Sequence, residues 1–513
     1  EGMRLLDAYQ NAFNRNYEES FSTEETINDI KRIELTYVFG RLGLHLYQLD
    51  APSGPPLRFK IYNPKGPVAL SDILPMLENL GLRVMEEIPY RARRKEAPYK
   101  IVIHDFGLEP RGKLMGSGDD VRSRFHAAFD QIWSGNMESD ALNALILSAG
   151  LDWREVTVLR AYTKYLRQTG ITFSEIYMAN TLVENATITR GIVDMFMARF
   201  QPHATKDAVV KATRQATRLR KKLFDQLEDV SSADQDRILR RYINLVDATL
   251  RTNFFQLTDD GELKTWLSFK LSSRDVEELP LPRPKFEIFV YAPRVEGVHL
   301  RFGNVARGGL RWSDRREDFR TEILGLVKAQ QVKNAVIVPV GSKGGFVVKN
   351  PPSEGGREAF LEEGIECYKT FIRGLLDLTD NLDSLGEVLP PPRVVRHDPD
   401  DPYLVVAADK GTATFSDIAN GVAADYGFWL GDAFASGGSV GYDHKKMAIT
   451  ARGGWESVKR HFREMGIDTQ TEDFTVIGVG DMSGDVFGNG MLLSEHIRLT
   501  AAFNHMHIFI DPN

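Results

Sequence analysis

A cluster of basic residues lies among glycine pairs in the second half of the chain. Arg307 precedes Gly308 and Gly309 in RGGLRW, and Lys343 precedes a second glycine pair in GSKGGF, with Lys333 between the two motifs. Glycine leaves backbone N–H groups open and neighbouring cations neutralise negative charge, so the pattern predicts turns that bind an anion such as a dicarboxylate. A lysine taken alone is more often a surface residue than a ligand, so the prediction depends on the cluster.

A second glycine cluster follows the apolar run FTVI near the end of the chain. Gly478, Gly480 and Gly484 form G-x-G-x-x-x-G, one residue looser than the dinucleotide fingerprint, and Asp481 directly follows the second glycine. We expect a strand before these glycines, a helix after them, and Asp511 at the end of the next strand, HIFID. This arrangement predicts a pyrophosphate at a helix N-terminus and a carboxylate for the ribose hydroxyls, which favours NAD over a 2′-phosphorylated cofactor.

Other residues with possible chemistry have ordinary interpretations. His505 and His507 resemble a metal-binding pair, but their spacing and surroundings favour core or surface histidines, and we expect no metal. His444 lies beside two lysines and is interpreted as a loop histidine. The single cysteine, Cys367, excludes an intramolecular disulfide and a multi-cysteine metal site.

Several motifs of the chain resemble those of the glutamate dehydrogenase superfamily, in the same order. They are RGGLR, KNAVIVPVGSKGG, AADKGTATFSD and GGSVGYDHKKMAITARGG. GVGDMSGDVFGNGML and DAFASGGS resemble more specifically the large bacterial NAD-dependent branch, in which long N-terminal regulatory segments precede the catalytic core. The resemblance implies oxidative deamination of L-glutamate to 2-oxoglutarate and ammonia, with hydride transfer to NAD.

The resemblance also implies roles for individual residues. Lys343 matches the catalytic lysine, which has a lowered pKa in the family and helps to activate the water that attacks the iminium carbon. Asp409 matches the aspartate that exchanges protons with the amino nitrogen. Lys333 matches the lysine for the substrate α-carboxylate, and Arg307 stands where the family has a lysine for the γ-carboxylate. Thr450 matches a threonine beside the nicotinamide carboxamide.

The motifs depart from the family pattern at two points. The stretch from Lys333 to Lys343 is shorter than in the small enzymes, and one glycine of the family's GG-x-K-GG loop is missing.

Arg452, which continues the motif of Thr450, is assigned to the cofactor as well.

Two other functions stay open, namely a dehydrogenase of another amino acid and a catalytically silent regulatory or scaffold relative. In relatives that act on leucine, phenylalanine or valine an apolar residue replaces the γ-carboxylate lysine, whereas the guanidinium of Arg307 can clamp a carboxylate. A silent relative is expected to lose Lys343 or Asp409, and both are present. The residues therefore favour glutamate.

The N-terminal part, residues 1–115, is predicted to be a small α+β module. Residues 57–106 read as strand, helix, strand, strand, with Ser71 as the helix N-cap and Gly81 as its end. This order resembles the ACT-type modules that bind amino acids between subunits, so an amino-acid effector is one expectation. A structural or oligomerising domain is the alternative.

The middle of the chain, residues 116–278, is predicted to be helical. Its clearest helix has a capping box at Asp152 and Glu155 and stops at Gly170. The proline-rich LPLPRPK then marks a linker into an α/β substrate-binding catalytic domain, residues 279–430. Its expected strands are FEIFVYAP, VHLRFGN, AVIVPV and YLVVAA, alternating with helical segments such as residues 357–378.

The last part, residues 431–513, is expected to begin an NAD-binding Rossmann-type domain. From the strand that leads into the glycine cluster onward, only two strands and one helix are expected, fewer than a dinucleotide site needs. The fold class is therefore multi-domain α+β and α/β, ending in an incomplete cofactor domain. We expect both ends to be cut from a longer protein and the chain to be inactive alone.

Composition restricts the class of partner. The formal net charge of -7 is spread over mixed charges, with 42% hydrophobic and 26% charged residues, so neither a nucleic acid nor a membrane surface is an expected partner. No apolar run is long enough to span a bilayer, and EGMRLLDAYQ is no leader sequence. We expect a cytoplasmic homo-oligomer that acts on small molecules.

Overall fold

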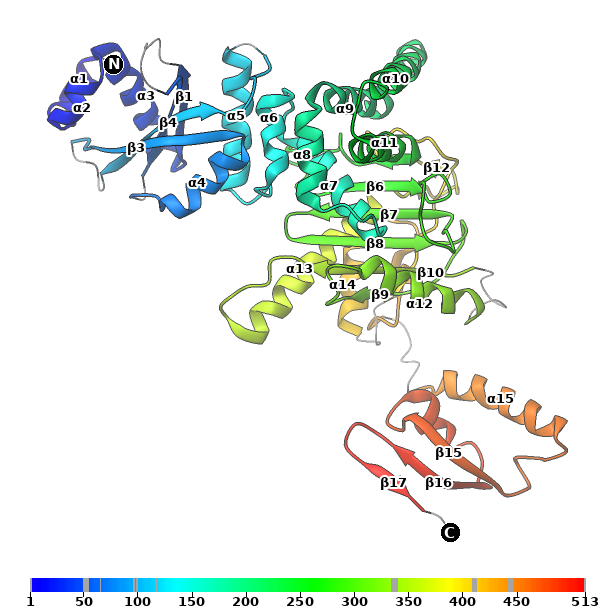
Figure 1. Cartoon of the computed structure of the whole chain (residues 1–513). Helices are drawn as coiled ribbons and strands as arrows, with labels where there is room; N and C mark the ends of the chain where they lie inside the picture. Colours follow the sequence, from blue (N-terminus) through cyan, green and yellow to red (C-terminus); the bar gives the residue numbers. More distant parts are fainter. Residues whose placement is uncertain are drawn as a thin grey trace. The chain divides into compact units, whose positions relative to one another are not determined.

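The computed structural model describes residues 2–48, 55–64, 66–95, 97, 100–116, 118–333, 340–407, 413–440 and 446–511. The chain divides into two compact units, residues 1–404 and 405–513, and each is described by itself. Figure 1 shows the elements of both units in sequence colours.

The first unit begins with three helices and a four-stranded antiparallel sheet, drawn in blue in Figure 1. The sheet has the order β1-β2-β4-β3, and its strands are β1 (Gly43–Gln48), β2 (Leu57–Asn63), β3 (Leu82–Ala92) and β4 (Ile101–Pro110). Helix α4 (Leu70–Asn79) lies between β2 and β3 in sequence. The predicted strand, helix, strand, strand order is confirmed, and β1 adds a strand that was not predicted.

The predicted N-cap of α4 is wrong. Ala69, not Ser71, holds the N-cap position, and it makes no side-chain capping bond. The Ser71 hydroxyl lies inside the first turn and contacts the Asp72 carboxylate at 3.2 Å. Helix α4 is stabilised instead by its apolar face, on which Ile73 and Leu77 are fully buried.

Helices dominate the chain from residue 118 to 248, as predicted. The N-terminal helices are α1 (Gly2–Tyr9), α2 (Arg15–Ser20) and α3 (Thr23–Phe39), and the middle ones are α5 (Gly118–Trp133), α6 (Leu145–Ser148), α7 (Trp153–Gln168), α8 (Glu175–Glu184), α9 (Ala186–Phe200), α10 (Lys206–Leu227) and α11 (Ala233–Ala248). The predicted capping box of Asp152 and Glu155 at the start of α7 is confirmed. Helix α7 is buried on most of its surface, so it forms part of the core.

A six-stranded sheet follows, with the order β5-β6-β7-β8-β10-β9. Its strands are β5 (Thr249–Thr252), β6 (Leu267–Ser272), β7 (Phe286–Ala292), β8 (Val295–Arg301), β9 (Leu310–Trp312) and β10 (Ser342–Val348). Neighbouring strands are antiparallel except for β9 and β10, which are parallel. The sheet starts at β5, ahead of the boundary expected at residue 279, because the hairpin of β5 and β6 pairs with β7.

Helices pack against both faces of this sheet. On one face, α13 (Gly356–Leu376) contacts β7, β8 and β10, and a Cβ at Gly297 would meet the Phe371 ring at 2.5 Å. On the other face lie α7, α11 and α12 (Phe319–Lys333), with Ile323 of α12 against Gly345. The predicted strands β7 and β8 and the predicted helix α13 are confirmed. Most of the predicted strand AVIVPV lies outside the described residues.

The second unit contains two small sheets. Strands β13 (Val406–Ala407) and β14 (Ala435–Ser436) are parallel, with α14 (Ala413–Asp425) beside them. Of the predicted strand YLVVAA, Val406 and Ala407 lie in β13, and Ala408 lies outside the described residues. Helix α15 (Ile449–Glu464) then leads to the three-stranded sheet β15-β16-β17.

The three-stranded sheet differs from the prediction. The strand parallel to β15 (Phe474–Asp481) is β16 (Ile497–Phe503), and HIFID contributes β17 (Ile508–Ile510), which is antiparallel to β16. Between β15 and β16 only the five-residue turn Asp485–Asn489 is helical, in π conformation. The expected helix after the glycines is therefore a short turn.

Candidate functional site

The two cation-bearing glycine motifs of the sequence lie side by side. The N–H of Ser342 donates to the carbonyl oxygen of Arg307 at 3.0 Å, and the N–H of Gly344 donates to that of Gly309 at 3.0 Å. An isolated bridge pairs Arg307 with Gly341 and extends the parallel pairing of β9 and β10. The backbone thus places Lys343 directly beside the Gly308–Gly309 peptide.

Close packing explains why glycine occupies these positions. A Cβ atom at Gly308 would lie 1.5 Å from the Ser342 carbonyl oxygen, and one at Gly344 would lie 2.4 Å from Leu310 Cδ2. The prediction that GSKGG forms an open turn is wrong, because Lys343 and both following glycines belong to β10. The N–H of Gly344 is already bonded to Gly309, so it is not open to an anion.

Lys343 is largely buried, with 7% of its surface exposed. It lies opposite Leu300 in the antiparallel pair of β8 and β10, and Leu300 lies opposite Glu287 of β7. Glu287, Leu300 and Lys343 therefore form one row across the sheet, on the same face as Gly345. Ile323 of α12 contacts Gly345, so Lys343 extends from the face that α12 covers.

The other predicted substrate residues are placed only in part. Arg307 is exposed, Gly308 is buried and Gly309 is intermediate in burial. Lys333 is the last residue of α12, and its side chain lies outside the described part of the structure. Asp409 lies outside the described residues as well.

A buried ionic network fixes the chain shortly before Asp409. Arg301 at the end of β8 pairs with the Asp401 carboxylate and donates to the carbonyl oxygen of Tyr403. Lys270 of β6 contacts Asp401 at 2.6 Å. Arg301 itself lies opposite Ser342, the residue before Lys343.

The sequence motifs do not predict this network. Its members also include Arg251, which pairs with Asp380 at 3.0 Å and Asp398 at 2.6 Å. The sequence does contain a signal for such ion pairs. Basic residues stand among apolar residues in the strand segments, and RHDPDDP supplies acidic residues that can pair with them. Burial opposes the charge on Asp401, but Arg301 and Lys270 outweigh it and hold the pKa of this carboxyl below its ordinary value.

A buried histidine lies on β8, the strand that pairs with the strand of Lys343. His299 of β8 faces Gly344, whose Cβ would meet the ring at 3.0 Å, and its Nε2 atom has no hydrogen-bond partner. Burial and then the charge of Arg301 lower the pKa of His299 to about 3, so it stays neutral. His299 and Lys343 are adjacent in register and extend from opposite faces of the sheet.

The predicted cofactor residues lie in the second unit. Thr450 and Arg452 are exposed near the start of α15, whose N-cap is Ala448. A Cβ at Gly478 would lie 1.9 Å from the ring of Phe487. Gly480 has a φ of 146° and open space where its Cβ would be, and Gly484 precedes the π-helical turn. The side chain of Asp481 lies outside the described part.

The predicted position of Asp511 is wrong. Strand β17 runs antiparallel to β16, and the N–H of Asp511 donates to the carbonyl oxygen of Thr500 in the middle of β16. Asp511 therefore does not stand at the carboxyl end of a strand parallel to β15, where a ribose ligand would be expected.

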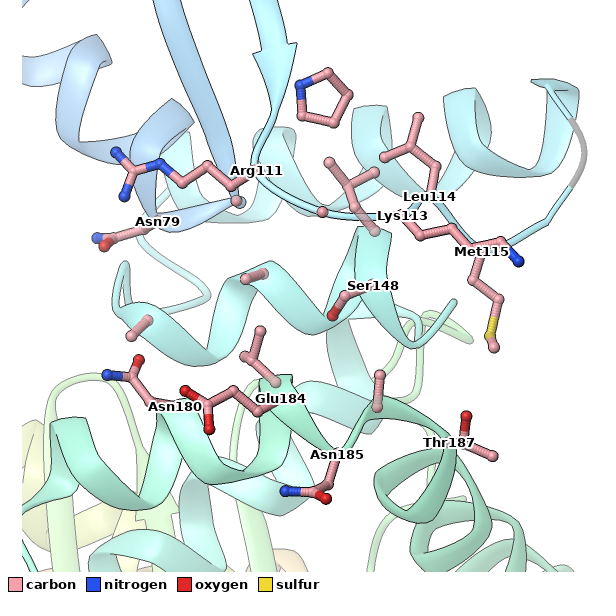
Figure 2. Close-up of a pocket in the computed structure, with 18 of the residues that line it drawn as sticks. Asn79, Arg111, Lys113, Leu114, Met115, Ser148, Asn180, Glu184, Asn185 and Thr187 are labelled. Atoms are coloured by element: carbon pink, nitrogen blue, oxygen red, sulfur yellow. The ribbon is translucent and has the colours of Figure 1, made fainter.

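A cavity of about 1100 Å³ lies in the first unit and contains none of the predicted site residues. It is bounded by the end of α4, the segment after β4, α6 and the junction of α8 with α9 (Figure 2). Its lining includes Glu78 and Glu184 together with Arg111 and Lys113. The chemistry of Lys343 thus does not belong to this cavity.

Neither a metal cluster nor a membrane span occurs among the described residues. They hold no group of three or more His, Cys, Asp or Glu side chains that could bind a metal ion. Within the same residues, every helix is too short or too polar to cross a membrane.

Comparison with known families and proteins gives consistent matches along the chain. Residues 222–513 match the family model described as bacterial NAD-glutamate dehydrogenase, catalytic domain. Residues 137–202 match glutamate dehydrogenase helical motif 3, residues 41–121 the ACT3 domain, and residues 1–35 helical motif 2.

Relatives that carry the name NAD-specific glutamate dehydrogenase include three bacterial proteins. The protein from Halomonas elongata is 54% identical over 99% of this chain, and that from Pseudomonas aeruginosa is 54% identical over 100%. The Mycobacterium tuberculosis protein is 58% identical over 87%. This chain covers only 31%, 32% and 28% of their respective lengths.

Proposed function

Because the chain belongs to the bacterial NAD-glutamate dehydrogenase family, we propose that the full-length protein oxidises L-glutamate to 2-oxoglutarate and ammonia with NAD as hydride acceptor. The observation that carries this proposal is the pairing of the Arg307 motif with the strand of Lys343. It brings Arg307, proposed for the γ-carboxylate, and Lys343, proposed as the base, to neighbouring backbone segments, as a single substrate site requires.

Each predicted site residue receives one role in this reaction. Lys333 binds the α-carboxylate and Arg307 the γ-carboxylate, with Gly308 and Gly309 providing close backbone approach. Lys343 accepts a proton from the attacking water, and Asp409 exchanges protons with the amino nitrogen. The burial of Lys343 supports its role, because a buried amine is shielded from the solvent that would otherwise compete for its proton.

The steps balance with these groups. Asp409 takes a proton from the substrate ammonium group, and the Cα–H bond then breaks with its electron pair leaving as hydride while the nitrogen lone pair forms the C=N bond. NAD, held by the glycines of β15, would supply the hydride acceptor. Water then adds to the iminium carbon while its proton passes to Lys343. The nitrogen takes back its proton from Asp409, and the C–N bond breaks as the C=O bond forms, with the hydroxyl proton passing to the departing ammonia. The protein's part is to align the groups and to exclude water.

The glycines at the end of β15 and just after it fit a dinucleotide. The parallel pair of β15 and β16 supplies the first strands of a Rossmann-type half, and the open space beside Gly480 leaves its backbone accessible. We therefore assign Gly478, Gly480 and Gly484 to NAD, with Asp481, Thr450 and Arg452 as further contacts. Asp511 is not retained, because of the direction of β17.

The N-terminal module is proposed to be ACT-like and to serve regulation. Its antiparallel sheet with α4, and the match of residues 41–121 to an ACT3 domain, support this proposal. The carboxylates and cations that line the cavity of Figure 2 suit a small zwitterionic effector such as an amino acid. The protein is further proposed to be a cytoplasmic homo-oligomer.

The test is NADH formation by the full-length protein with a panel of amino acids. Glutamate should give the highest kcat/KM, and leucine, valine and phenylalanine should be poor substrates. A preference for an apolar amino acid would replace the proposal with the alternative dehydrogenase. Tight NAD binding without turnover of any amino acid would favour the silent relative.

A further inference from the structure

Helix α7 of the helical region contacts the start of α12 through a fully buried polar cluster. We call it the α7–α12 clamp and define it as Tyr165, Gln168, Glu287 and Arg320. Tyr165, Glu287 and Arg320 have no exposed surface, and 6% of Gln168 is exposed. Helix α7 falls in the segment that matches helical motif 3, whereas β7 and α12 belong to the catalytic-domain match. The clamp therefore joins two segments that are separate in the sequence.

The side-chain half of the clamp is centred on Glu287. Arg320 Nε donates to Glu287 Oε2 at 2.8 Å, and Arg320 Nη2 donates to Glu287 Oε1, a bidentate pair. The Tyr165 hydroxyl donates to Glu287 Oε2 at 3.0 Å. Burial opposes the charge on Arg320, but Glu287 outweighs it and keeps the pKa of Arg320 above its ordinary value. The carboxylate thus fixes one residue of α12 and one of α7.

The backbone half of the clamp is made by Gln168, the last residue of α7. Its Oε1 accepts from the N–H of Arg320 at 3.1 Å, and its Nε2 donates to the carbonyl oxygen of Arg316 at 2.9 Å. The amide of Gln168 therefore bonds to the backbone on both sides of Phe319, the residue at which α12 begins. This fixes where α12 starts and how it is rotated about its axis.

The clamp lies on the face of the sheet from which Lys343 extends. Glu287, Leu300 and Lys343 occupy one row in β7, β8 and β10, so Glu287 and Lys343 are about 10 Å apart across two strand spacings. Helix α12 connects the parallel strands β9 and β10 and ends at Lys333. A helix moves as a rod, so a change at its first turn displaces its last residue.

From this geometry we infer that Tyr165 and Gln168 are positioning residues for glutamate binding, through the placement of α12 and of Lys333. The inference rests on the proposed function for the role of Lys333. It makes helix α7 part of the substrate site's support rather than a spacer between domains. Removing either side chain should misplace the carboxylate-binding end of α12 while leaving the cofactor residues, which lie in the other unit, unchanged.

The chain offers a matched control on the same helix. Tyr162 is also buried, and its hydroxyl contacts the Thr249 hydroxyl at 2.8 Å, away from α12. Tyr165→Phe and Tyr162→Phe each remove one tyrosine hydroxyl group from α7. A general loosening of α7 would therefore affect the kinetics of the two variants equally. Gln168→Met removes both amide bonds with little change in volume, and Gln168→Glu keeps the acceptor for Arg320 but loses the donor to Arg316.

Steady-state kinetics of the full-length variants test the inference. Tyr165→Phe and Gln168→Met should raise the KM for glutamate by roughly three- to thirty-fold, with a smaller change in kcat and an unchanged KM for NAD. Gln168→Glu should lie between wild type and Gln168→Met, and Tyr162→Phe should match wild type. Equal effects of the two tyrosine variants, or a rise in the KM for NAD as large as that for glutamate, would overturn the inference.

Hydrogen exchange measured by mass spectrometry tests the contact between α7 and α12 independently of the proposed function. Tyr165→Phe should speed exchange in peptides covering residues 316–329, and not in residues 356–376 of α13. Unchanged exchange in α12 overturns the clamp whatever the kinetics. A wild-type protein without glutamate-dependent NADH formation refutes the proposed function and the kinetic role of the clamp, while the exchange result still decides whether α7 holds α12.

Discussion

Gly308 and Ser342 lie so close together that a Cβ atom on residue 308 would stand 1.5 Å from the Ser342 carbonyl oxygen. The obstacle is backbone, which cannot rotate away as a flexible side chain can. Because Lys343 follows Ser342, the contact also fixes the strand that carries this residue beside Gly309.

Gly308→Ala should separate the two paired segments and lower the melting temperature and the glutamate turnover of the full-length protein together. Steric overpacking of this kind costs about 1–3 kcal/mol or more. Gly325→Ala is the matched control, because Gly325 lies exposed in α12 with no atom within 4 Å of its Cβ position. That change should be neutral or stabilising. Similar melting curves for both variants would contradict the close approach.

Lys343→Ala should abolish turnover in the full-length protein while leaving NAD binding nearly intact, because its amine acts on the substrate. Loss of a general base costs on the order of 10²- to 10⁴-fold in rate. Lys328→Ala, at an exposed position of α12, is the control and should keep wild-type kinetics. Retention of more than about a tenth of the wild-type rate by the Lys343 variant would remove Lys343 from the mechanism.

Arg307→Leu should raise the KM for glutamate and improve leucine relative to glutamate, because the cation for the γ-carboxylate is lost. Arg307→Lys keeps the charge and should restore much of the preference. The measurement is the ratio of kcat/KM for glutamate to that for leucine. An unchanged ratio in Arg307→Leu would assign the γ-carboxylate to another residue.

Local sequence patterns predicted the elements whose signals lie within one segment. The capping box of Asp152 and Glu155 and the apolar strands β7 and β8 are such elements. GSKGG predicts a turn because a glycine pair leaves backbone N–H groups open and the neighbouring cation neutralises negative charge. In the fold, the space beside these glycines is filled by side chains from other elements, such as Leu310 and Ile323, and this cannot be read from the segment itself.

Strand direction and the buried ion pairs could not be predicted either, because both depend on contacts between segments that are far apart in the sequence. IRLTAAF and HIFID are both apolar runs, and only long-range pairing decides that the first is parallel to β15 and the second antiparallel to its partner. Arg251, Lys270 and Arg301 each lie in buried strands, and their carboxylate partners come from a segment about a hundred residues or more away. The sequence therefore predicts that the motifs of Arg307 and Lys343 belong to one site, but it does not predict the buried ion pairs that hold the neighbouring strands.

Asp511→Ser should leave the preference for NAD over NADP unchanged in the full-length protein. The antiparallel β17 places Asp511 beside Thr500, away from the carboxyl end of β15, where the ribose is expected. The measurement is the ratio of kcat/KM for the two cofactors. A clear gain with NADP would mean that a carboxylate at this position does repel the 2′-phosphate, and would contradict the direction of β17.

The buried network around Asp401 predicts a pH dependence of stability. Arg301 and Lys270 hold the pKa of Asp401 below its ordinary value despite burial. A carboxyl whose folded pKa is lowered contributes stability above its unfolded pKa of about 3.9, and this contribution is lost as the pH falls through the folded pKa. The contribution of Asp401 should therefore be full at pH 7 and decline below about pH 4.

Asp401→Asn isolates this contribution. At pH 7 it should destabilise the protein by about 3–5 kcal/mol, because Lys270 and Arg301 lose a charged partner in the interior. The gap in melting temperature between wild type and variant should narrow as the pH falls below about 4, because the wild-type carboxyl then becomes neutral as well. Asp259→Asn, at an exposed position, should show no gap at any pH. A gap of constant size from pH 7 to pH 3 would mean that Asp401 stabilises the fold by packing and not by its charge.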